Sequence, residues 1–264
     1  MQTRSEPADL THAAAASMGR SESEASLCRA TLYAALALGF RPPTTETLQR
    51  LTAPAAAAAL ADAAAGLDVG LRTLAAALTQ PAATLDTLST EHRRLFGHTV
   101  RAAVPAYETE YGDEALFQQP QEMSDLGGFM RAFGLALRPD VHERVDHVSC
   151  ECEFLSFLAC KEAYAIESAD EEMGSATVRA TGLFLRAHLG RFVPAFTYRL
   201  AQEAPGTLYE RLAGLLGALV EFDCRRLGVP HGKITLGLRP DPASVAAPMG
   251  CDAADNGSCP GGAT

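Results

Sequence analysis

Apolar residues recur along most of the chain at intervals of three and four positions, which is the spacing of one face of an α-helix. Glycine, proline and capping residues bound these stretches and predict where each helix begins and ends. The predicted helices span residues 21–38, 45–51, 54–65, 67–78, 82–96, 120–137, 143–168, 176–203 and 207–227. No stretch alternates apolar and polar residues as a half-buried strand does. The pattern therefore predicts an all-α protein, a single-domain helical bundle of about eight to ten helices.

Three local features predict details of these helices. Ser21 and Glu24 form a capping-box pattern and predict the start of the first helix. Gly127 and Gly128 have no side chain, which favours the close approach of a neighbouring element. Pro194 lies inside the stretch 176–203 and predicts a kink or a break there, because proline has no backbone N–H.

Composition divides the chain into three parts. Residues 1–20 predict a disordered N-terminal arm, residues 21–230 an all-helical domain, and residues 231–264, rich in Gly, Pro, Ala and Asp, a flexible C-terminal tail. The tail contains Cys251 and Cys259. Two thiols without a further Cys or His close by make a poor zinc site, so we interpret them as incidental. A labile metal site or a redox pair is the alternative.

Size and charge narrow the class of protein. The 264 residues, 47% of them hydrophobic, suffice for one globular domain with a sizeable core. The net charge of −10 argues against a nucleic-acid partner and is compatible with a basic peptide. Neither a secretory signal nor an apolar run of about 18 residues is present, which predicts no stable membrane insertion. The seven cysteines then indicate reduced thiols in a cytoplasmic protein.

Residues 143–158 combine a charged beginning with an apolar continuation. At 100° per residue, His147 and Phe154 share one helix face, and Asp146 and Glu151 lie at its two edges. An acid or imidazole at a buried face costs several kcal/mol unless it is paired, so this placement needs a reason. One interpretation is capping of the helix by Asp146, with His147 a satisfied core residue. The other is a binding site.

The loop of residues 107–112 brings together aromatic rings, hydroxyl groups and carboxylates. Carboxylates accept bidentate hydrogen bonds from guanidinium groups, and tyrosine rings stack on arginine side chains. These groups suit an extended peptide that carries arginines. The alternative is that Tyr107 and Tyr111 simply cover the core.

Three motifs together resemble the TorD/DmsD/NarJ-type chaperones of molybdenum-enzyme maturation. They read ERVDHVSCECEFLSFL over residues 143–158, PAYETEYG over residues 105–112 and GGFMRAFGL over residues 127–135. Their order and spacing are similar to that family over roughly residues 28–228. The resemblance implies a TorD-like all-helical chaperone fold and a protein that is not an enzyme.

The resemblance also implies a client and a site. It implies binding of the catalytic subunit of a molybdopterin oxidoreductase and of its twin-arginine signal peptide, with assistance in cofactor insertion and assembly before export. The residues to which it carries signal-peptide binding are Tyr107, Glu108, Tyr111, Asp146, His147 and Glu151. The chaperone itself is expected to hold no cofactor and no metal, and monomer and dimer both stay open. Because an unperturbed histidine titrates near neutrality, His147 predicts peptide binding that changes with pH.

Two other classes of protein compete with this reading. One is a helical-bundle metal-binding enzyme, since Glu143, His147 and Glu151 are each four residues apart. A di-iron bundle, however, needs two Glu-x-x-His motifs, and the sequence contains none. The other is a structural subunit of a membrane-associated redox complex, which would remain in the finished enzyme.

Overall fold

A computed structural model describes residues 7–79, 84–97, 102–112, 119–138 and 143–240. Within these ranges the chain forms ten α-helices, two short 3-10 helices and no strand, so the predicted all-α class is confirmed. The helices are α1 (Pro7–Phe40), α2 (Thr45–Leu51), α3 (Pro54–Ala65), α4 (Val69–Ala76), η1 (Ala77–Thr79), α5 (Leu85–Phe96), η2 (Glu108–Glu110), α6 (Gln119–Ala132), α7 (Val148–Glu167), α8 (Glu171–Ala187), α9 (Leu189–Glu203) and α10 (Leu208–Leu227).

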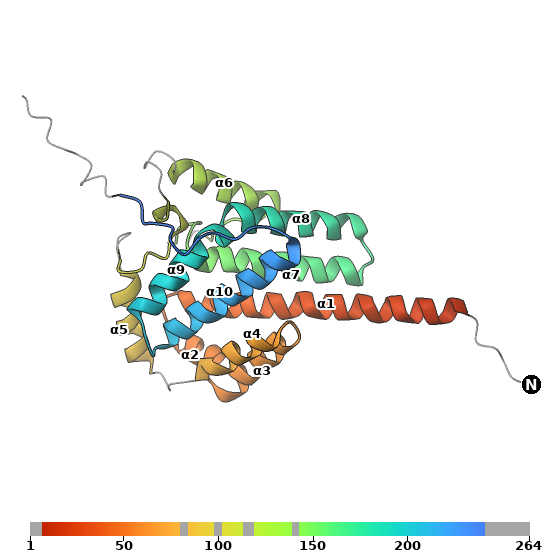
Figure 1. Cartoon of the computed structure of the whole chain (residues 1–264), viewed down its shortest axis with the longest axis horizontal. Helices are drawn as coiled ribbons and strands as arrows, with labels where there is room; N and C mark the ends of the chain where they lie inside the picture. Colours follow the sequence, from red (N-terminus) through yellow and green to blue (C-terminus); the bar gives the residue numbers. More distant parts are fainter. Residues whose placement is uncertain (1–6, 80–83, 98–101, 113–118, 139–142, 241–264) are drawn as a thin grey trace, which may run out of the picture.

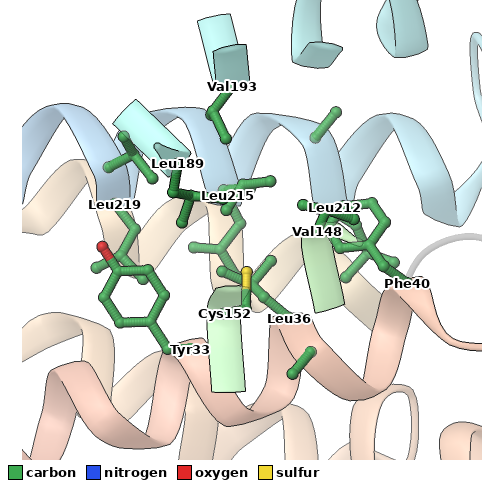
Figure 2. Close-up of a cluster of buried hydrophobic side chains, with 14 of the residues drawn as sticks. Tyr33, Leu36, Phe40, Val148, Cys152, Leu189, Val193, Leu212, Leu215 and Leu219 are labelled. Atoms are coloured by element: carbon green, nitrogen blue, oxygen red, sulfur yellow. The ribbon is translucent and has the colours of Figure 1, made fainter. Parts of the chain in front are cut away.

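Helices α1 and α7 lie side by side through the middle of the molecule, and α9 and α10 pack across them (Figure 1). Figure 2 shows the side chains that meet there, each no more than 1% exposed: Tyr33, Leu36, Phe40, Val148, Cys152, Leu189, Val193, Leu212, Leu215 and Leu219. Burying a large apolar side chain contributes about 1.5–3 kcal/mol. This four-helix contact therefore contributes much of the buried apolar surface, and the start of α7 belongs to it.

A buried ionic cluster joins the same helices at another point. The guanidinium of Arg29 in α1 lies 2.9 Å from Glu162 of α7 and 3.6 Å from Asp223 of α10. Asp223 also accepts a hydrogen bond from the Tyr33 hydroxyl, at 3.0 Å, and pairs with Arg226 at 3.0 Å. Since buried charges are tolerated only when paired, the cluster specifies how α1, α7 and α10 fit together.

Several helix ends lie where local signals predict them. The Thr44 side chain caps α2, and Thr207 caps α10, each accepting hydrogen bonds from backbone N–H groups of the first turn. Gly66 follows α3, and Gly228 ends α10 in the left-handed conformation, with φ of 65°.

Other boundaries differ from the prediction. Helix α1 already begins at Pro7, so Ser21 lies inside a helix instead of capping one, and residues 7–20 are helical where a disordered arm was expected. Residues 1–6 lie outside the described ranges. Helix α7 begins at Val148 and not at residue 143, because His147 is its N-cap in an extended conformation.

The glycine pair of α6 does not mark a close approach between helices. Nothing lies within 4 Å of the place where a Cβ of Gly128 would stand, and a Cβ of Gly127 would meet only the side chain of Arg131. The helix also ends at Ala132, five residues before the predicted end at residue 137.

The break predicted at Pro194 lies instead at His188, where the backbone leaves the helical conformation (φ −124°, ψ −107°) between α8 and α9. Pro194 remains inside α9. Because proline has no N–H, the carbonyl of Gly190, four residues earlier, has no helical donor. The N–H of Gly232, beyond α10, donates to that carbonyl at 2.8 Å.

Residues 231–240, which we call the C-terminal strap, are thus attached to the helical body and are not a loose tail. Figure 1 shows this blue segment running back across α9. Three backbone hydrogen bonds hold it: Gly232 N–H to Gly190 C=O (2.8 Å), Gly112 N–H to Gly237 C=O (3.0 Å) and Arg239 N–H to Glu110 C=O (2.9 Å). Residues 241–264, with Cys251 and Cys259, lie outside the described part of the chain.

Candidate functional site

The two motifs with charged and aromatic residues meet at the start of α7. Tyr107 and His147 form an antiparallel bridge. On either side of it, the Glu108 N–H donates to the Asp146 carbonyl and the Val148 N–H donates to the Ala106 carbonyl, both at 2.8 Å. The structure therefore brings the 105–111 loop and residues 146–148 together through backbone pairing.

Asp146 is fully buried and holds the loop in place. Its Oδ2 accepts a hydrogen bond of 2.7 Å from the Thr109 hydroxyl. The guanidinium of Arg144 forms a fork on it, Nε to Oδ1 at 2.9 Å and Nη2 to Oδ2 at 2.7 Å. The carboxylate is consequently occupied by this chain's own arginine, and capping of α7 by Asp146 is wrong.

His147 caps α7 with its ring. Its Nδ1 accepts the backbone N–H of Ser149 at 3.2 Å, so the proton of the neutral ring is on Nε2. The side chain is 4% exposed, and this burial lowers the pKa of His147 to about 4, although Glu143 and Asp146 oppose the shift. This lowered pKa gives no support to peptide binding that changes with pH near neutrality, which stays a prediction.

Tyr107 is half-buried and presents its ring at the surface of the site. Its hydroxyl donates to Glu143 Oε1 at 3.0 Å, and the Arg144 guanidinium lies 4.7 Å from the ring centroid. Burial, followed by the nearby Glu143 carboxylate, raises the pKa of Tyr107 to about 12. The phenol is thus a neutral hydrogen-bond donor at any physiological pH.

Glu108 and Tyr111 face inward from the same loop, and neither is exposed. Glu108 accepts from Arg191 Nη2 at 2.9 Å and lies 3.1 Å from Nδ1 of His188. The Tyr111 hydroxyl donates to the Pro105 carbonyl at 2.9 Å, and burial raises the pKa of that phenol. Tyr111 therefore covers the core, as the alternative interpretation of the loop proposed.

Glu151 lies one turn into α7 and is fully buried. Neither of its carboxylate oxygens has a hydrogen-bond partner among the described residues. Burial raises the pKa of Glu151 well above its ordinary value, and the carboxylates of Glu108 and Asp146 add to the effect. Burial therefore favours the neutral form of this acid, which does not pair with His147.

Sequence reasoning did not single out the partners that occupy these carboxylates. They are Thr109, Arg144, His188 and Arg191. Arg144 lies two residues before Asp146 and forms part of the motif, so proximity could have indicated it. Arg191 is 83 residues from Glu108, and no local pattern connects the two.

The open part of the site is a groove over the start of α7. A hollow of about 410 Å³ is lined by Tyr107, Glu143 and His147, with α5 on its other side. Glu143 also lines a second hollow of about 520 Å³. A third, of about 210 Å³, shares Leu137 and Glu153 with the second. We call these three adjoining hollows the α7 groove; a larger hollow of about 620 Å³, between α9 and α10, contains none of the predicted site residues.

Metal-ligating clusters and membrane-spanning helices are both absent from the described part of the chain. No group of three or more His, Cys, Asp or Glu side chains there is arranged to hold a metal ion. No helix among those residues is long and apolar enough to cross a membrane. The cysteines described are all free: Cys28, Cys150, Cys152, Cys160 and Cys224.

Comparison with known proteins connects this geometry to a family. The model of the family described as nitrate reductase delta subunit matches residues 60–198, which include both motifs of the site. The selenate reductase assembly chaperone of Thauera selenatis is 33% identical over 156 residues, covering 57% of this chain and 76% of that protein. The chlorate reductase assembly chaperone of Ideonella dechloratans is 33% identical over 158 residues, with the same shares. The chaperone protein TorD of Photobacterium profundum is 26% identical over 129 residues, 49% of this chain and 58% of that protein.

Proposed function

This chain belongs to the nitrate reductase delta subunit family and is an assembly chaperone, not an enzyme, and we propose that its client is the catalytic subunit of a molybdopterin oxidoreductase. Two relatives named for the assembly of selenate and chlorate reductases support a reductase as client. The chaperone binds the apo-enzyme and its twin-arginine signal peptide in the cytoplasm. It thereby assists cofactor insertion and assembly and delays export until they are complete.

The observation that carries this proposal is the order of groups along the α7 groove. One end presents the ring of Tyr107, the imidazole of His147 and the partly exposed carboxylate of Glu143. The other end is apolar and contains Leu137 and Phe157. A leader with two arginines followed by an apolar stretch has the same order, so each part meets a suitable surface.

The six residues assigned from the sequence have different tasks in this proposal. Tyr107 and His147 line the groove and contact the peptide. The buried Asp146 and Glu108 hold the loop that carries Tyr107, through Thr109 and Arg191. Tyr111 supports the loop from its buried side, and Glu151 lies on the buried side of the start of α7.

Glu143 joins this set, because it lines both hollows at the charged end of the groove. It is the carboxylate best placed to accept a guanidinium, since Asp146 and Glu108 already bind arginines of this chain. Arg41 also lines the groove, but it is paired with Glu153. The Glu153 carboxylate therefore offsets the charge repulsion between Arg41 and an incoming arginine.

The proposal is tested with a fluorescent peptide that carries two adjacent arginines followed by an apolar stretch, and with the matched peptide in which both arginines are lysines. We expect the chaperone to prefer the arginine peptide, because only a guanidinium binds a carboxylate through two parallel hydrogen bonds. The combined change Tyr107→Ala and Glu143→Gln should weaken binding by roughly tenfold or more, or about 1.4 kcal/mol. Fluorescence anisotropy provides the measurement.

Tyr164→Ala is the matched control, because Tyr164 is a 63% exposed tyrosine of α7 that does not line the groove. It should leave peptide affinity unchanged. Equal affinity of wild-type protein for the two peptides would exclude arginine recognition. Undiminished binding by the Tyr107 and Glu143 double variant would remove the groove from the proposal.

A further inference from the structure

The C-terminal strap carries an arginine into the body of the molecule. Leu238 forms an antiparallel bridge with Tyr111. On one side of it the Gly112 N–H donates to the Gly237 carbonyl at 3.0 Å, and on the other the Arg239 N–H donates to the Glu110 carbonyl at 2.9 Å. The strap therefore lies against the loop as an added extended segment, which is how many proteins bind peptides.

The Arg239 side chain is 2% exposed and lies in a small built site. Its Nη2 donates to Glu122 Oε1 of α6 at 2.7 Å. Its guanidinium packs on the bare backbone of Gly112, where a Cβ would stand 3.1 Å from both Nε and Nη2. Gly112 also has φ of +150°, so a side chain there would be strained as well as obstructive.

The fit of Arg239 to this site is incomplete. Its Nε and Nη1 are buried and have no hydrogen-bond partner among the described residues, and the same is true of Glu122 Oε2. Glu122 Oε1 is shared with Arg191, whose Nη2 lies 3.4 Å away. Because each unsatisfied buried group costs free energy, an arginine that engages both carboxylate oxygens would bind more strongly than Arg239 does.

The rest of the strap is only partly buried, with Leu236 and Leu238 packed against the edge of the core. Among residues 231–240, Arg239 alone is buried, and Ile234 is 57% exposed. Three backbone hydrogen bonds attach these ten residues to the helices and the loop. A segment with few backbone hydrogen bonds and no fully buried apolar side chain opens locally at a lower free-energy cost than the helices do.

We propose that Gly112, Glu122 and the backbone edge at Tyr111 form a binding site for an extended, arginine-bearing segment of the client, which residues 236–240 of this chain occupy in the client's absence. The proposal deepens the proposed function and rests on it, since the client's leader supplies such a segment. The strap shows the recognised chemistry, namely an arginine beside apolar residues, as in Leu236-Gly-Leu-Arg239. Client binding then requires displacement of the strap. Because only molecules with an open site can bind, the apparent affinity for the client falls in proportion to the fraction of sites that the strap leaves open.

The first test compares affinities for the twin-arginine peptide. Arg239→Ala should increase the affinity by about fivefold or more, because the internal competitor is lost. Adding Glu122→Gln in the same chain should abolish that gain, because the carboxylate acceptor is lost. Arg225→Ala is the matched control, since Arg225 is an exposed arginine of α10 paired with Glu221, and it should change nothing.

The second test follows hydrogen exchange in wild-type protein when the peptide is added. The Arg239 amide belongs to the strap and should exchange faster, because displacement breaks its bond to Glu110. The Gly112 amide belongs to the body and should stay protected, because the peptide replaces the strap carbonyl. This opposite behaviour separates displacement from a general loosening of the structure, and thermal unfolding of Arg239→Ala verifies that the variant is folded.

The outcomes distinguish this inference from the proposed function. If the twin-arginine peptide binds but Arg239→Ala leaves its affinity unchanged and the Arg239 amide stays protected, the strap is purely structural and the inference fails alone. If no variant binds that peptide, the proposed function fails. In that case a synthetic peptide of residues 232–240 decides the inference. Its binding to the Arg239→Ala variant supports an arginine-segment site, and its failure to bind overturns the site.

Discussion

At the scale of single residues, two of three buried carboxylates at this site bind an arginine of the chain and the third does not. Asp146 is paired with Arg144, Glu108 with Arg191, and Glu151 with no group among the described residues. A buried acid without a donor or a cation is more stable in its neutral form. The unpaired acid and the neutral His147 should therefore make folding stability depend on pH in opposite directions.

Glu151 should lower stability as pH rises. Because its folded pKa is raised, the unfolded chain releases the proton above about pH 4.5 while the folded protein retains it, and stability falls. Glu151→Gln should remove this loss, so the variant's stability should rise more steeply between pH 4.5 and 7, by up to about 1.4 kcal/mol per pH unit. Urea denaturation over that range gives the measurement. Glu153→Gln, an exposed neighbour, is the control, and a Glu151→Gln profile parallel to wild type would contradict the prediction.

His147 should act in the opposite sense. Its folded pKa of about 4 lies below the ordinary value of 6.5, so the unfolded chain binds the proton first as pH falls, and stability is lost between pH 6.5 and 4. His147→Asn preserves the N-cap and removes the titration, so this loss should become smaller, by up to about 3 kcal/mol at pH 4. The same urea experiment measures it. A loss equal to that of wild type would show that His147 titrates normally.

At the scale of elements, the strap depends on a proline inside α9. Pro194 leaves the Gly190 carbonyl without a helical donor, and Gly232 supplies one. Contact is close, since a Cβ on Gly232 would stand 1.8 Å from the Arg191 carbonyl oxygen. The beginning of the strap therefore docks where a helix is interrupted in its hydrogen bonding, and it does so through a residue without a side chain.

Gly232→Ala should detach the beginning of the strap. We expect the Arg239 amide to lose protection by roughly tenfold or more in hydrogen exchange, about 1.4 kcal/mol of local stability. Gly128→Ala is the matched control, because nothing lies within 4 Å of a Cβ there and alanine favours the helix, so stability should rise by up to about 1 kcal/mol. Unchanged protection of Arg239 in the Gly232 variant would mean that the strap is held by its far end alone.

At the scale of the whole molecule, packing of α1 against α7 and α10 determines the architecture. The contact is mostly apolar, but it contains the charged cluster of Arg29, Glu162 and Asp223. Removing the central cation would leave two buried carboxylates with Arg226 as their one cationic partner among the described residues. This cluster is therefore the point at which one substitution should disturb all three helices.

Arg29→Ala should destabilise the protein by about 3–5 kcal/mol, the usual effect of breaking a buried ion pair from one side. Chemical denaturation followed by circular dichroism measures the change. Arg50→Ala, which removes an exposed arginine from its pair with Glu46, should change stability by no more than about 0.5 kcal/mol. Similar effects of the two substitutions would show that the cluster is dispensable.

Much of the fold was predictable because its signals are local. The ends of α2, α3 and α10 follow from capping and stop residues within four positions of each boundary. The start of α7 was misjudged by five residues, since a histidine N-cap resembles an ordinary helical position when periodicity alone is considered. The break at His188 was also missed, because no proline or glycine stands at that position.

The candidate site was predictable in its members but not in their orientation. The resemblance assigned both segments to one binding role, and backbone pairing joins residues 106–108 to residues 146–148. Exposure of Asp146, Glu108 and Glu151 was implied by a peptide-binding role, yet all three are buried. Burial of a carboxylate depends on its cation, and Arg191 lies 83 residues beyond Glu108.

The amino-acid sequence by itself determined the helical class, most helix boundaries and the two segments that form the site. Tertiary structure alone decided which carboxylates bind the chain's own arginines, that residues 231–240 return to the loop, and that Arg239 reaches Glu122 across 117 residues. The physical reason is the range of the interactions. Helix hydrogen bonds and caps connect residues four positions apart, whereas pairing of buried charges connects whatever residues the packed helices place within about 3 Å of one another.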